Sequence, residues 1–150
     1  MTSKILDLTE TTLFGVLSLI YVDLQKSEDV YAPADCYTLI DGLYMELKCR
    51  RIHYDALLLE KLKYDRLKEM ADRRKMKPVY ICSTPKGVWK FDLSEMQLNW
   101  AVEQLPKTTD FGNQELVSKV VTYLPVTFGR KLADQYLTKQ SAPDNEGARF

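Results

Sequence analysis

An aspartate, a glutamate and a lysine are spaced so that one β-hairpin would bring them together. Asp35 precedes an apolar-rich run, and Glu46 and Lys48 lie in the next such run, after Asp41 and Gly42. Asp-Gly between two such runs is typical of a two-residue hairpin turn, which needs positive φ at both positions. Neighbouring side chains on one face of such a hairpin are roughly 5 Å apart across the pair and 7 Å along the strand, and two carboxylates at such distances suit a hard divalent cation. A lysine beside them could orient a water or stabilise charge on a phosphate.

The turn predicts the pairing of the two strands. With Asp41 and Gly42 as the loop, Asp35 pairs with Lys48 and Tyr37 with Glu46. Alternation then predicts a nearly apolar face on the core side, made of Cys36, Thr38, Ile40, Leu43, Met45, Leu47 and Cys49. The opposite face receives Asp35, Tyr37, Glu46, Lys48 and Arg50. The alternative interpretation is an exposed Asp35–Lys48 ion pair, which would contribute little to stability.

Two further charged residues are candidates for the same site. A helical projection that starts at Tyr54 places Lys63 in the middle of the helix face expected to pack against the rest of the protein. A cation at that position needs a partner, which would be the hairpin carboxylates or a substrate phosphate. The alternative is a lysine that extends past the helix edge into solvent. Glu10 either assists the metal site or closes a helix-capping box that begins at Asp7.

Charge is strongly segregated although the net charge is zero. Residues 1–47 hold two Lys/Arg against eight Asp/Glu, residues 48–77 hold eleven against five, and residues 78–150 hold eight of each. A basic stretch after an acidic one is typical of a protein that binds a polyanion with basic residues placed around a metal-binding carboxylate cluster. The candidate phosphate contacts are Arg50, Arg51, Arg73, Arg74, Lys75 and Lys77. A solvated helix face with i,i+4 ion pairs would also explain the pattern.

Length and composition predict one globular domain over residues 1–140 with a flexible tail over 141–150. The longest apolar stretch is too short for a membrane span and no basic leader precedes it, so we expect a soluble protein without a secretion signal. Three cysteines without CxxC spacing indicate reduced thiols in a cytosol-like compartment. With His53 as the only histidine, we expect neither zinc-finger spacing nor a serine or cysteine catalytic triad.

The elements alternate in an α/β pattern. We expect a mostly buried helix from residue 7 to about 25, the hairpin, and a second helix over 54–71. Strands follow over 79–83 and 88–93, joined by a second hairpin turn, and short helices are predicted near 94–105 and 113–123. Trp89, Tyr80 and Phe91 alternate along these strands, which favours core positions over base-stacking platforms.

One motif resembles the PD-(D/E)xK nuclease signature. It consists of Asp35, followed after ten intervening residues by Glu46-Leu47-Lys48. Ala34 stands between Pro33 and Asp35, which are adjacent in the named motif. The order of elements over residues 7–93 is similar to that of the small archaeal-type Holliday junction resolvases: a helix with a glutamate, the Asp strand, the ExK strand, a helix and a hairpin. This resemblance implies a restriction-endonuclease-like fold, with a mixed central sheet of four to five strands flanked by helices.

The resemblance also implies a function. Mg²⁺, with Mn²⁺ as a substitute, would be bound by Asp35, Glu46 and the main-chain carbonyl of Leu47, with Lys48 positioning the attacking water and Lys63 or Glu10 assisting. The expected protein is a DNA endonuclease acting on branched or recombination intermediates, as a homodimer or within a replication or recombination complex. The expected location is the cytoplasm of a prokaryote or a phage-infected cell, away from the membrane. The alternatives are an inactive nuclease-like scaffold that binds nucleic acid or a protein, and a plain α/β interaction module.

Overall fold

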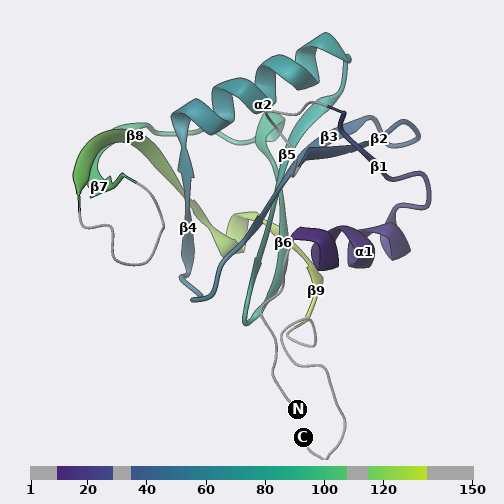
Figure 1. Ribbon diagram of the computed structural model, residues 1–150, viewed down its shortest axis with the longest axis horizontal. Coiled ribbons are helices and arrows are strands. Elements are labelled where there is room, and N and C mark those ends of the chain that lie inside the picture. The colour runs from purple at the N-terminus through teal and green to yellow at the C-terminus, as the bar shows by residue number, and fades with distance from the viewer. Residues whose placement is uncertain (1–9, 29–34, 108–114, 135–150) are drawn as a thin grey trace, which may run out of the picture.

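The computed structural model describes residues 10–28, 35–107 and 115–134. Within these ranges a six-stranded sheet, in the order β1-β2-β3-β5-β6-β9, lies between the two α-helices, and a three-stranded sheet has the order β4-β8-β7 (Figure 1). The elements are α1 (Glu10–Ile20), β1 (Gln25–Lys26), β2 (Asp35–Thr38), β3 (Leu43–Cys49), β4 (Ala56–Glu60), α2 (Lys61–Arg73), β5 (Lys77–Thr84), β6 (Gly87–Asp92), β7 (Ala101–Pro106), β8 (Leu116–Pro125) and β9 (Arg130–Ala133). Two 3₁₀ turns, Leu93–Glu95 and Val126–Phe128, connect them.

The large sheet has a hydrophobic core on each face, because alternate residues of each strand point to opposite sides. On one face, Leu13 and Leu17 of α1 pack on side chains that include Met45, Val79 and Ile81. On the other face, Leu67 and Ala71 of α2 pack on a second set, which includes Tyr44, Tyr80, Phe91, Leu57, Leu59 and Leu124. The three-stranded sheet therefore shares the core on the α2 face.

The predicted mixed α/β architecture is confirmed. β3 and β5 are parallel and are connected through β4 and α2, whereas the other paired strands of the large sheet are antiparallel. The sheet has six strands instead of four to five, because the short edge strands β1 and β9 add to it. The three cysteines are free, as expected for thiols in apolar runs.

The predicted register of the first hairpin is wrong by two residues. Thr38 pairs with Leu43, so the loop has four residues and Asp35 faces Glu46 directly. The loop is held from outside the hairpin, since the Asp23 carboxylate accepts hydrogen bonds from the backbone N–H groups of residues 39 and 40, at 2.7 and 2.9 Å. A shift of two residues preserves the side of every strand residue. The predicted core face is therefore confirmed for the strand residues, whereas Ile40 is exposed in the loop.

The second predicted helix is partly wrong. Residues 56–60 form β4, which pairs antiparallel with β8, and α2 begins only at Lys61. The sequence Ala-Leu-Leu-Leu-Glu has high helix propensity, but Leu57 and Leu59 are buried while their neighbours are half-exposed. This period of two is that of a strand, and pairing with β8 overrides the local propensity.

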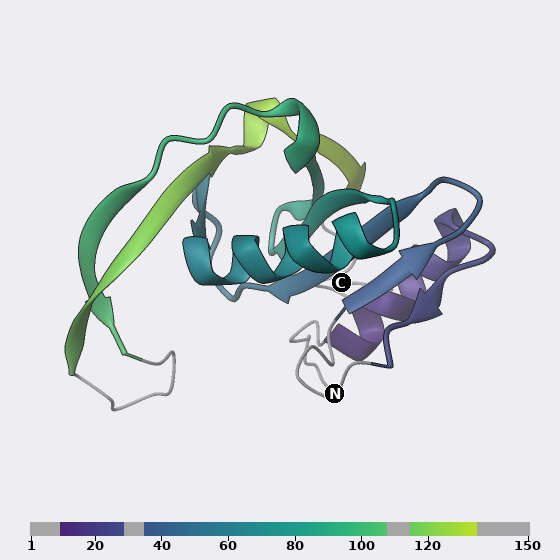
Figure 2. The same ribbon diagram turned by 90° about the horizontal axis from the view of Figure 1, so that it is seen from above.

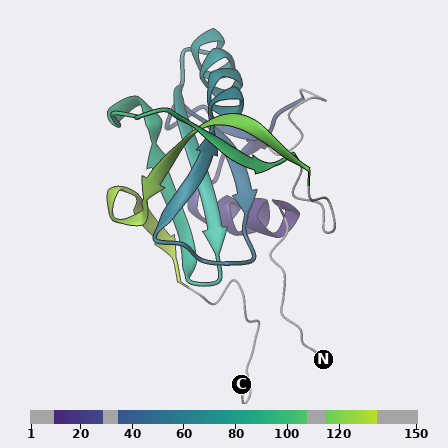
Figure 3. The same ribbon diagram turned by 90° about the vertical axis from the view of Figure 1, so that its left-hand side faces the viewer.

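The predicted helices near 94–105 and 113–123 are also wrong. The chain there forms β7 and β8, which pair along their length from Ala101–Val121 to Pro106–Leu116. β8 is rich in β-branched residues, which favour a strand. Figure 2 shows the two strands extending away from the body beside α2, and Figure 3 shows them in front of the large sheet.

The first helix is shorter and more exposed than predicted. α1 ends at Ile20 instead of Gln25, and of its residues only Leu13 and Leu17 are buried. It stops because the chain turns at residues 22–23 toward β1, which pairs with β2. No helix in the described ranges combines the length and apolarity needed to cross a membrane. Asp7 and the expected tail over 141–150 lie outside the described residues.

Candidate metal and phosphodiester site

Asp35 and Glu46 form a buried pair of carboxylates on the α2 face of the large sheet. They are directly opposite each other on β2 and β3, with 1% and 6% of their surfaces exposed. The expectation that they share a face is confirmed, and the observed register brings them closer than the predicted one. Two carboxylates at directly paired positions repel each other, so this position requires a compensating positive charge.

Arg66 of α2 supplies that charge in the structure. Its Nη1 donates to Asp35 Oδ2 at 3.0 Å and its Nη2 donates to Glu46 Oε1 at 2.9 Å. The planar guanidinium thus joins both carboxylates. The Arg66 side chain is 29% exposed, so one side of this cluster is open to solvent.

Burial, together with repulsion from Asp35, raises the pKa of Glu46 from 4.5 to about 7. The nearby positive charges of Arg66, Lys63 and Lys48 oppose this rise. Hydrogen bonding to Asp35 raises the pKa of Arg66 against the effect of burial, so the guanidinium stays charged. Near neutral pH the cluster is therefore close to a change in protonation at Glu46.

Glu46→Gln should change how stability depends on pH in metal-free buffer. A folded-state pKa of about 7 means that the native state holds a proton that the unfolded chain has lost above pH 4.5. The stability that this proton contributes is present at low pH and is lost as the pH rises through about 7. We expect the stability of Glu46→Gln relative to wild type to increase by about 1–3 kcal/mol between pH 5 and pH 8. Urea unfolding at both pH values measures this, and an unchanged difference would contradict the assignment.

Lys48 and Lys63 both lie within electrostatic range of Glu46, since each lowers its pKa. Lys48 is two residues along β3 on the same face, and its side chain is partly buried. Lys63 comes from α2, one helical turn before Arg66, and is exposed. Both predicted lysines are thus close enough to affect Glu46 electrostatically, and they come from two different elements.

Glu10 and the Leu47 side chain belong to the other face of the sheet. Leu47 packs in the α1 core, so only its main chain could take part in a site on the α2 face. Glu10 is the first residue of α1, and its charge affects the pKa of Cys49, which is on the α1 face of β3. Within the described part of the chain, no hydrogen bond or ion pair joins Glu10 to Asp35 or Glu46.

The predicted phosphate contacts do not form one surface. Lys77 pairs with Leu43 at the start of β3, and Arg73, Arg74 and Lys75 precede it. Arg50 and Arg51 follow the other end of β3, which is roughly 20 Å away at the rise of an extended strand. The carboxylate pair lies between these two groups. Any nucleic acid that contacts both groups must therefore run along the length of β3.

Much of the positive charge on α2 is already paired. Three i,i+4 ion pairs on this helix have N···O distances of 2.7 to 2.9 Å: Lys61–Asp65, Lys68–Asp72 and Arg73–Glu69. The alternative interpretation of the basic stretch as a solvated helix face is therefore confirmed for these residues. Such exposed pairs contribute little to stability and are readily exchanged for phosphate contacts.

Two of the predicted phosphate contacts have other partners. The Arg50 guanidinium donates to the Leu58 carbonyl at 2.6 Å and to the Tyr80 hydroxyl at 3.4 Å, which ties the end of β3 to β4 and β5. The Arg74 guanidinium lies over the rings of Tyr37 and Tyr44, at 4.6 and 5.5 Å from their centroids. Trp89, Tyr80 and Phe91 are buried, as predicted for core residues.

Arg66 is the residue of this site that sequence reasoning missed. The helical projection from Tyr54 included residues that in fact belong to β4, so the docking face was centred on Lys63. The buried residues of α2 are Leu67 and Ala71, and Arg66, about 100° around the helix from Leu67, lies outside the centre of this face and reaches the carboxylates through its long side chain. A buried Asp–Glu pair needs a cation, which is the signal that could have identified it.

The donor set fits a hard divalent cation with several of its own waters. The two carboxylates offer oxygen ligands on one face, and the Leu47 main chain adjoins them in β3. In the described ranges, no group of three or more His, Cys, Asp or Glu side chains has the arrangement of a metal centre. A cation here would therefore be held by two side chains, as is usual for Mg²⁺.

The arrangement combines buried carboxylates with several cationic side chains from two elements. That combination can hold a metal ion, orient a phosphodiester and place a water, but it can also be a purely structural ion cluster. Comparisons with known proteins do not decide between these interpretations. No protein-family model matches the sequence, and no curated protein or solved structure matches the chain.

Proposed function

We propose that this chain is a divalent-metal-dependent DNA endonuclease similar to the PD-(D/E)xK enzymes, with Asp35, Glu46 and Lys48 as its catalytic residues. The observation that carries the proposal is the direct pairing of Asp35 with Glu46 in a buried position, with Lys48 on the same face. Buried like charges cost stability unless they are paired. An active site that binds a cation is one physical reason for retaining such a pair.

The order and pairing of the elements support the proposal. A helix precedes an antiparallel hairpin that carries Asp35 and Glu46, and α2 then connects β3 to the parallel strand β5. This order is the one that the sequence resemblance implies for a restriction-endonuclease-like core. The catalytic carboxylates lie on the face covered by α2, so the helix can supply Lys63 and Arg66 to the same site.

Asp35 and Glu46 would hold Mg²⁺, together with the main-chain carbonyl of Leu47. Bound Mg²⁺ would supply Lewis-acid stabilisation of charge on the phosphodiester. Lys48 holds the attacking water in position and Lys63 attracts the phosphate to the site. Because Glu46 must be ionised to act as a ligand, its raised pKa makes activity increase from pH 6 to pH 8.

Arg66 would have to leave the carboxylates for a cation to bind them. Its side chain is 29% exposed, so the guanidinium would turn outward, where a substrate phosphate would offer it a bidentate partner. Arg66 then changes from a counter-ion of the resting site to a contact for DNA. The same residue thereby stabilises the fold when substrate is absent.

The ion cluster around Arg66 also favours a second candidate function. Because Arg66 already bonds to both carboxylates, the site is neutralised to a large extent without any metal. A nuclease-like scaffold that binds nucleic acid or a protein partner would need no more than this. The two functions differ in whether Mg²⁺ changes the protein.

A cleavage assay tests the proposed function. Branched, duplex and single-stranded DNA are incubated with the chain in Mg²⁺, in Ca²⁺ and in EDTA, and products are resolved on denaturing gels. We expect cleavage in Mg²⁺ or Mn²⁺ of at least one of these DNA structures. DNA binding without cleavage in any metal, and without a Mg²⁺-induced rise in melting temperature, would support the scaffold instead.

Lys48→Ala should abolish cleavage but leave metal binding intact. The lysine acts on the water and the phosphate and is not a ligand, so its loss removes a transition-state interaction. We expect a fall in the cleavage rate of about 10²-fold or more. The matched control is Lys68→Ala on the exposed surface of α2, which should cleave at the wild-type rate. Equal rates for the two variants would remove Lys48 from the mechanism.

A further inference from the structure

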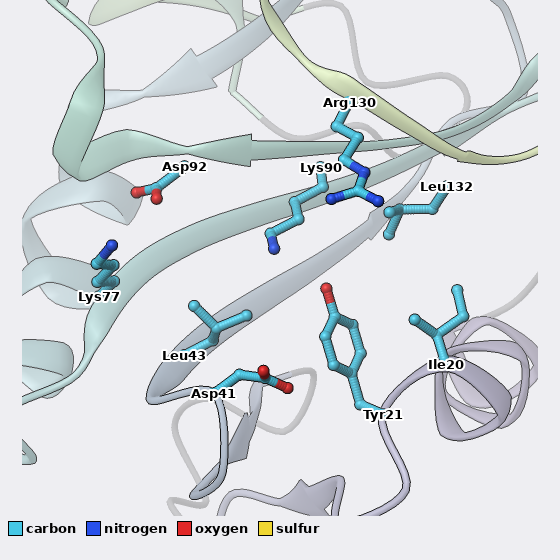
Figure 4. A pocket seen from close by; sticks show the side chains of 9 residues that line it. All are labelled: Ile20, Tyr21, Asp41, Leu43, Lys77, Lys90, Asp92, Arg130 and Leu132. Atoms are coloured by element: carbon cyan, nitrogen blue, oxygen red, sulfur yellow. The ribbon is translucent and has the colours of Figure 1, made fainter.

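A polar pocket lies on the α1 face of the sheet, away from the carboxylate pair. It has a volume of about 410 Å³ and is lined at one side by Tyr21, Lys90 and Arg130 (Figure 4). Lys90 pairs with Ile81, whose side chain is in the α1 core, whereas Glu46 pairs with Tyr80, whose side chain is in the α2 core. The two sites therefore lie on opposite faces of the sheet.

Lys90 and Arg130 are directly opposite each other on β6 and β9. Two positive side chains at paired positions, about 5 Å apart at their Cβ atoms, destabilise the strand pair. Among the ion pairs found in residues 10–28, 35–107 and 115–134, none involves Lys90 or Arg130. Both cations thus line the pocket without an ion-pair partner among the described residues, Lys90 half-buried and Arg130 exposed.

Tyr21 adds a hydroxyl group to the same wall. It follows the last turn of α1, it is 8% exposed, and its ring lies 5.7 Å from Lys90 Nζ. In Figure 4 its hydroxyl points into the pocket, toward the side occupied by Lys90 and Arg130. An ammonium, a guanidinium and a phenolic hydroxyl that converge in this way are the donors that bind an oxyanion.

The opposite side of the pocket carries carboxylates. Asp92 accepts hydrogen bonds from the N–H and the hydroxyl of Ser94, at 3.1 and 2.6 Å, and Asp41 is exposed in the hairpin loop. Lys77, also at this side, lies 3.8 Å from Glu95. A continuous row of phosphates would be repelled by the two aspartates. A single phosphate with hydroxyl or amino groups at its other end would find acceptors there.

We propose that this pocket binds a small phosphate monoester, such as a sugar phosphate or a mononucleotide, with its phosphate between Lys90, Arg130 and Tyr21. The far end of the ligand donates hydrogen bonds to Asp41. A cavity of this volume is of the size that holds a small organic ligand. This proposal is independent of catalysis at Asp35 and Glu46.

Calorimetric titration in EDTA tests the proposal. The probes are inorganic phosphate, ribose 5-phosphate, ribose and a short DNA duplex, each added to the full chain. We expect ribose 5-phosphate to bind more tightly than inorganic phosphate, and ribose not to bind. Lys90→Gln and Arg130→Gln should each weaken ribose 5-phosphate binding by about tenfold or more.

Lys131→Gln is the matched control, because Lys131 is the next residue of β9 and lies over Trp89 on the other face. It should bind ribose 5-phosphate as wild type does. Without ligand, Lys90→Gln should raise the melting temperature by about 1–3 °C, since the repulsion from Arg130 is removed. No binding of ribose 5-phosphate, equal binding by all variants, or a dependence on Lys90 and Arg130 seen only with DNA would each overturn the proposal.

Discussion

Glu46→Gln should abolish Mg²⁺-dependent cleavage while the chain stays folded. The amide keeps the shape of the side chain and an oxygen for Arg66, but it lacks the charge that a hard cation requires. Lewis-acid stabilisation is worth several kcal/mol, so we expect the cleavage rate to fall by about 10³-fold or more. The measurement is a single-turnover time course on the best DNA substrate of wild type, at pH 8.

The matched control is Glu69→Gln, which removes an exposed glutamate that forms an ion pair with Arg73 within α2. It should cleave at the wild-type rate. Because relief of repulsion between Glu46 and phosphate is expected, DNA binding by Glu46→Gln in EDTA should be unchanged or tighter. Full cleavage by Glu46→Gln would exclude this carboxylate as a ligand.

Arg66→Met should produce the largest loss of stability among the variants of this site. It removes the cation from two buried carboxylates and leaves them uncompensated, which typically costs about 3–5 kcal/mol. The loss should be largest at pH 8 and smaller at pH 5, where protonation of Glu46 relieves the repulsion. Urea unfolding at the two pH values measures it, and Lys68→Met on the exposed side of α2 is the control.

The effect of Mg²⁺ on the stability of Arg66→Met distinguishes the nuclease from the nuclease-like scaffold. If the carboxylates are a metal site, Mg²⁺ should bind Arg66→Met more tightly than wild type, because no guanidinium competes for the same oxygens. If Mg²⁺ binds the native state and not the unfolded chain, a free Mg²⁺ concentration of one hundred times Kd would raise the free energy of unfolding by about 2.7 kcal/mol. If Mg²⁺ leaves the free energy of unfolding of Arg66→Met unchanged, the cluster has a structural role only.

The sequence was sufficient to predict the faces of the hairpin but not its register. Asp-Gly is a strong local signal, and the strand residues it placed toward the core are buried there. The actual loop is set by Asp23, which is 16 residues from Leu39 and holds the backbone of the loop. A contact between segments so far apart leaves no trace in the local turn signal. Asp35 and Glu46 share a face in both the predicted and the observed register, because a shift of two residues keeps each side chain on its face.

The wrong helices have one physical cause in common. The run 56–60 becomes a strand only by pairing with β8, far along the chain, and β7 and β8 become strands by pairing with each other across the segment between them. Local propensity for helix is worth a fraction of a kcal/mol per residue, and burial of Leu57, Leu59 and Leu124 in a shared core outweighs it. Arg66 was missed for a different reason, because it lies outside the centre of the apolar face of α2 and reaches the carboxylates only through its long side chain.

Metal binding by the purified chain tests the central claim most directly. Calorimetric titration of metal-free wild type with Mn²⁺ at pH 8 should show one ion bound per chain, and Mg²⁺ should compete for it. Binding should weaken by about tenfold or more in Glu46→Gln and stay unchanged in Glu69→Gln. No bound ion in wild type, or equal binding by wild type and Glu46→Gln, would contradict a metal site at Asp35 and Glu46.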